Sequence, residues 1–134
     1  MTDVKKYTVY ILEENKDLLK NIKDSLLATN NFTVIGNSDS AVSCLNYLSN
    51  NTCDLLIIDL MLSNIDGIGV LNKLKEINNR AYNKVVCITS FTNPLICETL
   101  EKLSVSYCFK QPFDINYFIS TLNSVMKLSL EDIK

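Results

Sequence analysis

The sequence predicts an α/β protein of the flavodoxin-like, doubly wound type, and one pattern carries that prediction. Five short apolar runs alternate along the 134 residues with five stretches in which apolar residues recur at helical spacing. Strands and helices that alternate in this way form a parallel sheet with helices on both faces. The right-handed crossover rule and the common order of such sheets predict strand order 2-1-3-4-5, with the first and last helices together on one face.

The five strands are expected where the apolar runs lie, at residues 7–12, 32–36, 54–59, 84–89 and 105–110. The third run contains four consecutive aliphatic residues, which is typical of a central strand covered on both faces. It ends in Asp59. Because open α/β sheets carry their chemistry at the carboxyl ends of the strands, Asp59 is a candidate for function rather than for packing.

The expected helices have apolar residues three or four positions apart. Their apolar faces consist of Leu18, Leu19, Ile22 and Leu26; Ala41, Leu45 and Leu48; Leu71, Leu74 and Ile77; and Ile115, Phe118, Ile119, Leu122, Val125 and Met126. Asn93 and Pro94 read as the N-cap and first residue of the fourth helix, and Asp114 as the cap of the fifth. Residues 1–128 are expected to form one domain, and residues 129–134 a polar, frayed tail that fits a natural end or a truncation before an output domain.

Composition limits the function classes. A net charge of −2 and a pI near 5.1, with scattered Lys and Arg, argue against nucleic-acid binding. No apolar run approaches the ~18 residues of a membrane span, and the N-terminus lacks a signal-peptide pattern, so we expect a cytoplasmic protein with protein partners. The chain has no histidine, which excludes a His-based triad, a Cys/His zinc site and a phosphohistidine donor. Five cysteines without a C-x-x-C pair do not predict a disulfide framework.

Three carboxylates are expected to meet at the carboxyl edge of the sheet. In the order 2-1-3-4-5 the first and third strands are neighbours, so Glu13 and Glu14 should lie beside Asp59. Like charges raise each other's pKa unless a cation binds, and hard oxygen ligands suit Mg²⁺ or Mn²⁺. The alternative, supported equally by the sequence, is that Glu13 and Glu14 are first-turn helix acids favoured by the macrodipole.

The fourth and fifth strands add polar groups at the same edge. Thr89 and Ser90 end the fourth strand, where a hydroxyl either serves the site or hydrogen-bonds the turn. The fifth strand ends in Lys110, Gln111 and Pro112.

This arrangement resembles the receiver domain of two-component response regulators over nearly the whole chain. The resemblance implies that Asp59 is the phosphoacceptor and that Thr89 is the switch hydroxyl. It also implies that Mg²⁺ is held by Glu13, Glu14, Asp59 and the backbone carbonyl of Met61. The segments 34–36, 65–71 and 112–114 are most similar to the receivers of the sporulation master regulators of spore-forming Firmicutes.

The sequence also departs from the pattern of the family it resembles. The position of the family's lysine holds Gln111, and Lys110 is one residue early, so side-chain alternation aims it away from the site. Cys108 stands at the switch aromatic, and Ser63 at the usual loop proline. The family places a cis peptide at Gln111–Pro112, which we therefore expect here. Glu in place of Asp displaces each metal-binding carboxylate by roughly 1–1.5 Å, so Mg²⁺ binding is expected to be weak.

Two functions remain open. In one, the chain is a pseudo-receiver, an interaction or dimerisation module that uses the surface of the fourth helix, fifth strand and fifth helix and no longer depends on phosphorylation. In the other, a histidine kinase, a phosphotransferase protein or a small phosphodonor phosphorylates Asp59, which shifts a two-state equilibrium of that surface. The sequence slightly favours the pseudo-receiver, because the losses all affect the positioning and charge on which phosphoryl transfer depends.

A stand-alone enzyme is not expected. Met61 stands where a phosphatase of the haloacid dehalogenase type would carry a second Asp, two residues after Asp59. The segment 67–69 lacks the third glycine of a dinucleotide-binding loop and follows no strand directly.

Overall fold

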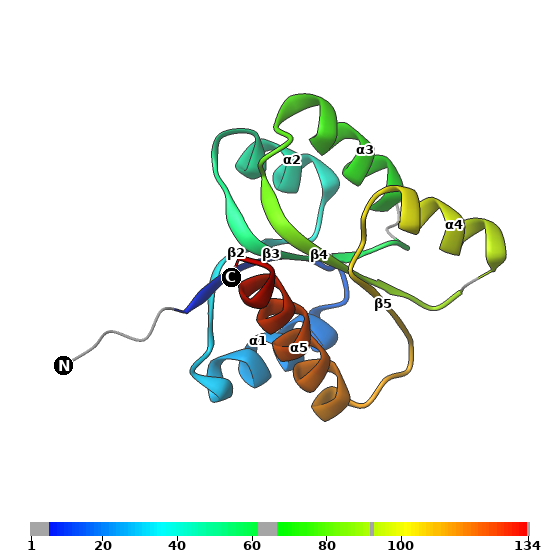
Figure 1. Cartoon of the computed structure of the whole chain (residues 1–134). Helices are drawn as coiled ribbons and strands as arrows, with labels where there is room; N and C mark the ends of the chain where they lie inside the picture. The colour runs from blue at the N-terminus through cyan, green and yellow to red at the C-terminus, as the bar shows by residue number, and fades with distance from the viewer. Residues whose placement is uncertain (1–5, 62–66, 92, 134) are drawn as a thin grey trace.

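The structure is a computed structural model that describes residues 6–61, 67–91 and 93–133, with side chains described as far as residue 127. Five strands and five helices alternate along this part of the chain and form one sheet with the order β2-β1-β3-β4-β5 (Figure 1). All four strand pairs are parallel. The predicted α/β class and strand order are confirmed.

The elements follow one another as strand and helix throughout. In chain order they are β1 (Tyr7–Leu12), α1 (Lys16–Thr29), β2 (Phe32–Ser38), α2 (Ala41–Asn50), β3 (Cys53–Asp59), α3 (Gly67–Ile77), β4 (Tyr82–Thr89), α4 (Pro94–Lys102), β5 (Tyr107–Lys110) and α5 (Ile115–Ile133).

Backbone pairing extends β2 and β4 beyond the apolar runs that predicted them. β2 continues to Ser38 rather than ending at residue 36, because its ladder with β1 runs on to the pair formed by Leu12 and Ser38. β4 begins at Tyr82 rather than at residue 84, because Tyr82 pairs with Cys53 at the start of β3. Ladder hydrogen bonds use backbone groups and do not need apolar side chains, so hydropathy alone placed these ends wrongly.

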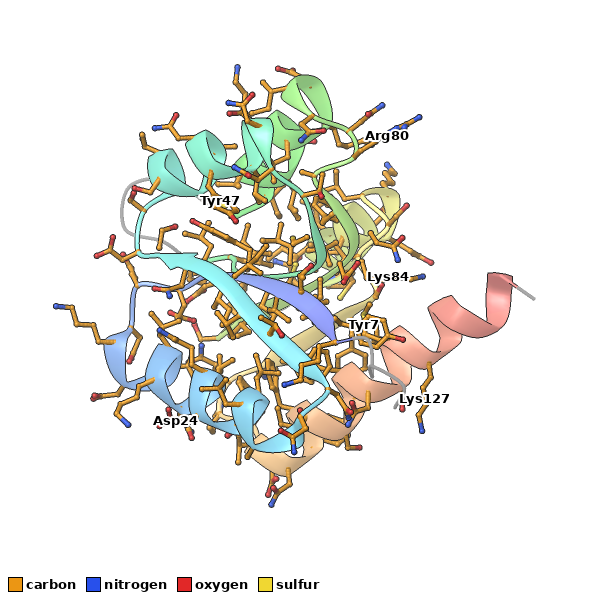
Figure 2. The ribbon with its side chains drawn as sticks, turned by 90° about the vertical axis from the view of Figure 1, so that its left-hand side faces the viewer. Tyr7, Asp24, Tyr47, Arg80, Lys84 and Lys127 are labelled. Atoms are coloured by element: carbon orange, nitrogen blue, oxygen red, sulfur yellow. The ribbon has the colours of Figure 1, made fainter. Side chains whose placement is uncertain are left out.

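The fifth strand and fifth helix also differ from their predicted ranges. β5 begins at Tyr107 rather than at residue 105, because the Val105 N–H donates to the Leu100 carbonyl at 3.0 Å and closes the end of α4. Ser104, between them, has a φ of 60°. The bounds of α5 include residues 129–133, for which the sequence predicted a frayed tail. Figure 2 shows the last turns of α5 extending past the end of the sheet.

The sheet separates two apolar clusters, which is the predicted distribution of the helices (Figure 1). One cluster joins α1 and α5 to the sheet through Ile22, Leu26, Phe118 and Leu122. The other joins α2, α3 and α4 to the opposite face through Cys44, Leu48, Leu71, Leu74 and Leu100. The four aliphatic residues of β3 are split between the clusters and have no exposed surface. Burial on both faces therefore fixes β3 at the centre of the sheet.

Local sequence sets the helix starts. The Asn93 side chain accepts a hydrogen bond from the Ile96 N–H at 2.8 Å, with Pro94 at the start of α4. Asp114 Oδ1 accepts from the N–H groups of Asn116 and Tyr117 at 2.7 and 3.1 Å. Both predicted caps are confirmed. Among the described residues, no helix has the length and apolar character needed to cross a membrane.

Gly67 packs directly against the end of β3. A Cβ atom at this position would lie 2.8 Å from the Asp59 carbonyl oxygen and 2.8 Å from the Leu60 Cα, both of which are backbone atoms. The Gly67 N–H also donates to the Leu60 carbonyl at 3.1 Å. The absence of a side chain at Gly67 is therefore what allows α3 to begin this close to Asp59.

Gly67→Ala is expected to lower the free energy of unfolding by roughly 1–3 kcal/mol, because the new methyl group forces backbone atoms apart. Urea unfolding monitored by circular dichroism measures this loss. Asn72→Ala, an exposed change on the same helix, is the matched control and should alter stability by less than about 0.5 kcal/mol. Equal stability of Gly67→Ala and the wild type would contradict the close packing described here.

Candidate functional site

The candidate site lies at the carboxyl edge of the sheet, on the right-hand side of Figure 1. Backbone hydrogen bonds continue past the strand ends there and fix the residues that follow. The Glu13 N–H donates to the Ser38 carbonyl at 3.1 Å, the Leu60 N–H to the Ile88 carbonyl at 2.8 Å, and the Gln111 N–H to the Thr89 carbonyl at 2.8 Å. The chain therefore leaves β1, β3 and β5 in a defined conformation at three positions along this edge.

Glu13 and Asp59 form a buried pair of acids at this edge. Glu13 is 1% exposed and Asp59 is 7% exposed. Leu12 of β1 and Ile58 of β3 are register partners on adjacent strands. Glu13 and Asp59, the residues that follow them, therefore lie beside each other at the edge. Asp59 Oδ1 accepts a hydrogen bond from the Met61 N–H at 2.8 Å, which holds the carboxylate at the strand end.

The electrostatic environment of Glu13 is unfavourable to its charge. Burial, the carboxyl of Asp59 beside it and the charge of Glu14 raise the pKa of Glu13 from 4.5 to about 8. The N–H of Asn15 acts in the opposite direction, because it donates to Glu13 Oε2 at 3.0 Å. Glu13 Oε1 is buried and has no hydrogen-bond partner in the described part of the chain. A proton or a cation between Glu13 and Asp59 would relieve this repulsion.

Asn15 is a site residue that the sequence analysis missed. Its side chain is the N-cap of α1 and accepts from the Leu18 N–H at 3.0 Å, while its own N–H holds Glu13. The signal was present, since Asn precedes the apolar pattern of the first helix by three residues and is a favoured N-cap. Asn15 thus fixes both the start of α1 and the direction of Glu13.

The residues present fit a divalent cation through two carboxylates. Glu13 and Asp59 supply hard oxygens, and one of them, Glu13 Oε1, is an unpaired buried acceptor. Mg²⁺ commonly takes one or two protein carboxylates and completes its shell with water and phosphate oxygens. Among the described residues, no group of three or more His, Cys, Asp or Glu side chains is arranged to hold a metal. Glu14 is half-buried and acts on Glu13 through its charge.

Thr89 is buried at the end of β4 and its hydroxyl is already engaged. Thr89 Oγ1 donates to the Phe91 carbonyl at 2.8 Å and accepts from the Phe91 N–H at 3.2 Å. The hydroxyl therefore closes the turn after β4, which is one of the two roles that the sequence left open for it. Ser90, the other hydroxyl considered, is exposed.

Lys110 and Gln111, at the end of β5, have different surroundings. Lys110 is the register partner of Thr89 and is exposed, and side-chain alternation gives it the face opposite to that of Phe109. Gln111 lines a pocket of about 320 Å³ with Asn15 and Leu18 of the α1 region. The Gln111–Pro112 peptide bond is cis.

Two of the predicted features fall on residues outside the described part of the chain. Ser63, the residue at the usual loop proline, and residues 65 and 66 of the sporulation-type segment lie outside the described residues. Met61 is described, and the structure shows its N–H bonded to Asp59.

The fold and its acidic carboxyl edge define a CheY-like α/β domain. The chain belongs to the response regulator receiver domain family, because the model of that family matches residues 9–123. It is therefore a receiver domain of two-component signalling, a regulatory domain rather than a catalytic one in the usual sense. Domains of this family typically bind Mg²⁺, and the family implies a histidine kinase or phosphotransfer partner.

Solved receiver domains share the fold at low sequence identity. The isolated receiver domain of RcsB from Salmonella enterica serovar Typhimurium, in the presence of the phosphomimetic BeF3-, has a TM-score of 0.79 at 20% identity, with 92% of this chain and 90% of that chain covered. A CheY-like receiver domain protein from Methanospirillum hungatei JF-1 has a TM-score of 0.79 at 14% identity and coverages of 95% and 99%. The non-phosphorylated HemR receiver domain from Leptospira biflexa has a TM-score of 0.78 at 18% identity and coverages of 90% and 94%.

Glu13→Gln is expected to stabilise the metal-free protein at alkaline pH. Because the pKa of Glu13 is raised in the folded state, the folded protein loses stability as pH rises from 4.5 to about 8, and it bears no such cost below 4.5. Each unit of the shift corresponds to about 1.4 kcal/mol, so even a partial effect raises Tm by several degrees. Melting curves in EDTA near pH 5 and near pH 9 measure the difference.

The matched control is Glu14→Gln, which removes a carboxylate from a half-buried position. It should change Tm less than Glu13→Gln does near pH 9. A gain for Glu13→Gln that is the same at both pH values would contradict the raised pKa of Glu13.

Proposed function

We propose that this chain is an atypical receiver, a protein-interaction or dimerisation module whose activity depends weakly or not at all on phosphorylation of Asp59. The observation that carries the proposal is the buried acid pair of Glu13 and Asp59, because neither carboxylate takes part in an ion pair described in this structure. The ion pairs described, Lys20–Asp24, Lys73–Glu76 and Lys102–Glu98, lie on exposed helix surfaces. The site is therefore strained electrostatically before a phosphoryl group adds further negative charge.

Gln111 supports the same proposal. The resemblance places a lysine here, whose charge would balance the phosphoryl group. Gln111 can donate a neutral hydrogen bond, which is roughly half as strong as a charge-assisted one. Lys110 does not replace that charge, because its side chain lies on the other face of the sheet from Phe109. It shares that face with Thr89 and Cys108. Phosphoryl transfer depends on positioning and charge, so this loss weakens it directly.

The surface of α4, β5 and α5 supplies a partner site. It exposes four large apolar side chains within or beside these elements: Phe91 is 55% exposed, Leu95 71%, Tyr107 36% and Tyr117 51%. The hydroxyls of Tyr107 and Tyr117 hydrogen-bond to each other across β5 and α5. Exposed apolar residues gathered on one face are typical of protein interaction sites. A second copy of this chain, or a phosphorylation-independent partner, is the proposed occupant.

A working phosphoacceptor is the second candidate function, and the placement of three residues favours it. Glu13, Asp59 and Thr89 lie at neighbouring strand ends, as the resemblance requires. Glu13 and Asp59 would hold Mg²⁺, with Glu14 and the Met61 carbonyl as the further ligands predicted from the sequence. When bound, the ion would offset the charge of the acids and of an incoming phosphoryl group. Asp59 would accept that group from a histidine kinase, a phosphotransfer protein or a small phosphodonor, and Thr89 would turn to hydrogen-bond it.

The proposal also covers the bounds of the domain, the subfamily and the location of the protein. We propose that the receiver domain spans residues 1–128 and that residues 129–134 follow it as a tail. The proposed likeness to sporulation master regulators rests on the segments 34–36, 65–71 and 112–114. The proposal that the active site is degenerate rests on the residues that depart from the family pattern, which are Glu13, Glu14, Cys108 and Gln111. We propose a cytoplasmic location, because a kinase-coupled receiver works there.

Mg²⁺ binding should be weak in this chain and stronger in the double variant Glu13→Asp/Glu14→Asp. Each shorter side chain withdraws its carboxylate by roughly 1–1.5 Å, which better fits an octahedral ion with ligands at about 2.0–2.1 Å. Isothermal titration calorimetry should give at least a severalfold lower Kd for the double variant. Glu98→Asp/Glu101→Asp on α4 is the control, and ordinary receiver-like affinity in the unmodified chain would contradict the positional argument.

Asp59→Ala and Gln111→Lys distinguish the two candidate functions. The proposed module should bind its partner or dimerise equally well with Asp59→Ala, and phosphodonor treatment of the wild type should leave that affinity unchanged. Sedimentation velocity and intact mass after incubation with acetyl phosphate measure both properties. A phosphoryl adduct on Asp59 that changes affinity would overturn the proposal in favour of the phosphoacceptor.

The control for Gln111→Lys is the exchange Lys110→Gln/Gln111→Lys, which moves the lysine by one position at constant charge. If the site accepts phosphoryl groups, both variants should increase the extent of Asp59 modification relative to wild type. An increase with Gln111→Lys alone would show that net charge, rather than position, is responsible.

A further inference from the structure

The five cysteines differ sharply in their exposure. Cys44, Cys53 and Cys87 are buried, whereas Cys97 on α4 is exposed and Cys108 on β5 is half-buried. Cys87 and Cys108 are register partners on neighbouring strands, but only Cys87 is sealed in the core. Cys108 is more exposed than Cys87 because β5 is the edge strand of the sheet.

Cys97 and Cys108 line the same pocket. Its volume is about 180 Å³, and it lies between α4 and β5 with Leu100 and Val105 in its wall. Cys108 packs against the apolar cluster of α2, α3 and α4, so its side chain is on the face of the sheet that α4 covers. Two thiols from different elements therefore share one solvent-accessible space.

Burial raises the pKa of four of the cysteine thiols. Burial and the neighbouring Cys97 raise the pKa of Cys108. Burial raises the pKa of Cys44 and Cys53 to about 12 and raises that of Cys87 strongly. Since the thiolate is the reactive form, the raised pKa values make the three core thiols unreactive. Cys97 is the one cysteine of the five that is exposed.

We propose that Cys97 and Cys108 form an oxidation-sensitive pair that closes into an intramolecular disulfide under peroxide. The Cys97 thiolate attacks hydrogen peroxide, which breaks the O–O bond, forms Cys97 sulfenic acid and releases hydroxide. The Cys108 sulfur then attacks the Cys97 sulfur, and the sulfenic hydroxyl leaves with the Cys108 proton as water. Overall the two thiols lose two protons and two electrons, and one hydrogen peroxide becomes two waters.

The disulfide would tie α4 to β5. A disulfide requires Cα atoms about 4.4–6.8 Å apart, so closure would hold the helix at that distance from the edge strand. α4 can adjust its position, because Leu100 is the one buried residue among the described residues of this helix. Cys108 occupies the position of the family's switch aromatic, and the bond would therefore act on the surface that exposes Leu95 and Tyr107. This effect on partner binding rests on the proposed function, whereas the disulfide itself does not.

The experiment treats the reduced, full-length chain with hydrogen peroxide and follows its intact mass. We expect a loss of about 2 Da, reversed by dithiothreitol, and a single cross-linked peptide pair that contains Cys97 and Cys108. Cys97→Ser and Cys108→Ser should each abolish the loss, while the control Cys53→Ala should retain it. Hydrogen exchange of the α4 backbone should slow severalfold on oxidation of the wild type and remain unchanged in Cys97→Ser.

Several results would overturn the proposal. These are a sulfenic or sulfinic adduct on Cys97 without the mass loss, a disulfide between two chains, and an intramolecular bond that involves a core cysteine. An intramolecular Cys97–Cys108 bond that leaves α4 exchange unchanged would overturn the proposed action on α4. None of these readouts depends on partner binding, so they are independent of the test of the proposed function.

Discussion

β3 lies between β1 and β4, is covered by helices on both faces and has four aliphatic residues with no exposed surface. Its registers with both neighbours are fixed by this double burial, because a slip of one residue would move every side chain to the wrong cluster. Fixed registers bring the residues after Leu12, Ile58 and Ile88 to one edge. The position of Glu13 and Asp59 is thus a consequence of packing that takes place several residues away from them.

The acid pair of Glu13 and Asp59 is held by backbone groups rather than by a cation. Backbone donors from Asn15 and Met61 hold the two carboxylates in place without supplying a full positive charge. The family fold tolerates this because its stability comes from the two apolar clusters rather than from the edge. The proposed partner surface of α4, β5 and α5 lies apart from the acid pair, so binding there would not depend on the chemistry of the edge.

Periodicity and burial determine the part of the structure that the sequence could predict. The sheet order, the helix faces and the caps at Asn93 and Asp114 follow from apolar spacing and capping preferences, which are local properties. The ends of β2 and β4 depend on backbone pairing with β1 and β3, which hydropathy does not report. At the site, the sequence indicated that Glu13 lies beside Asp59, whereas the predicted group of three carboxylates with Glu14 is not found among the described residues. It did not reveal that Glu13 is buried while Glu14 is half-buried, or that Asn15 holds Glu13.

The hydroxyl of Thr89 has one hydrogen to donate, and it donates it to the Phe91 carbonyl. Any other acceptor at the edge of the sheet must therefore compete with the turn after β4 for the same hydrogen. If another acceptor takes this hydrogen, the Phe91 carbonyl loses its hydrogen bond to Thr89. The side chain of Phe91 is already 55% exposed. The stability of this turn therefore opposes any other hydrogen bond from the Thr89 hydroxyl, and a ligand at the edge has to offer a more favourable one to displace it.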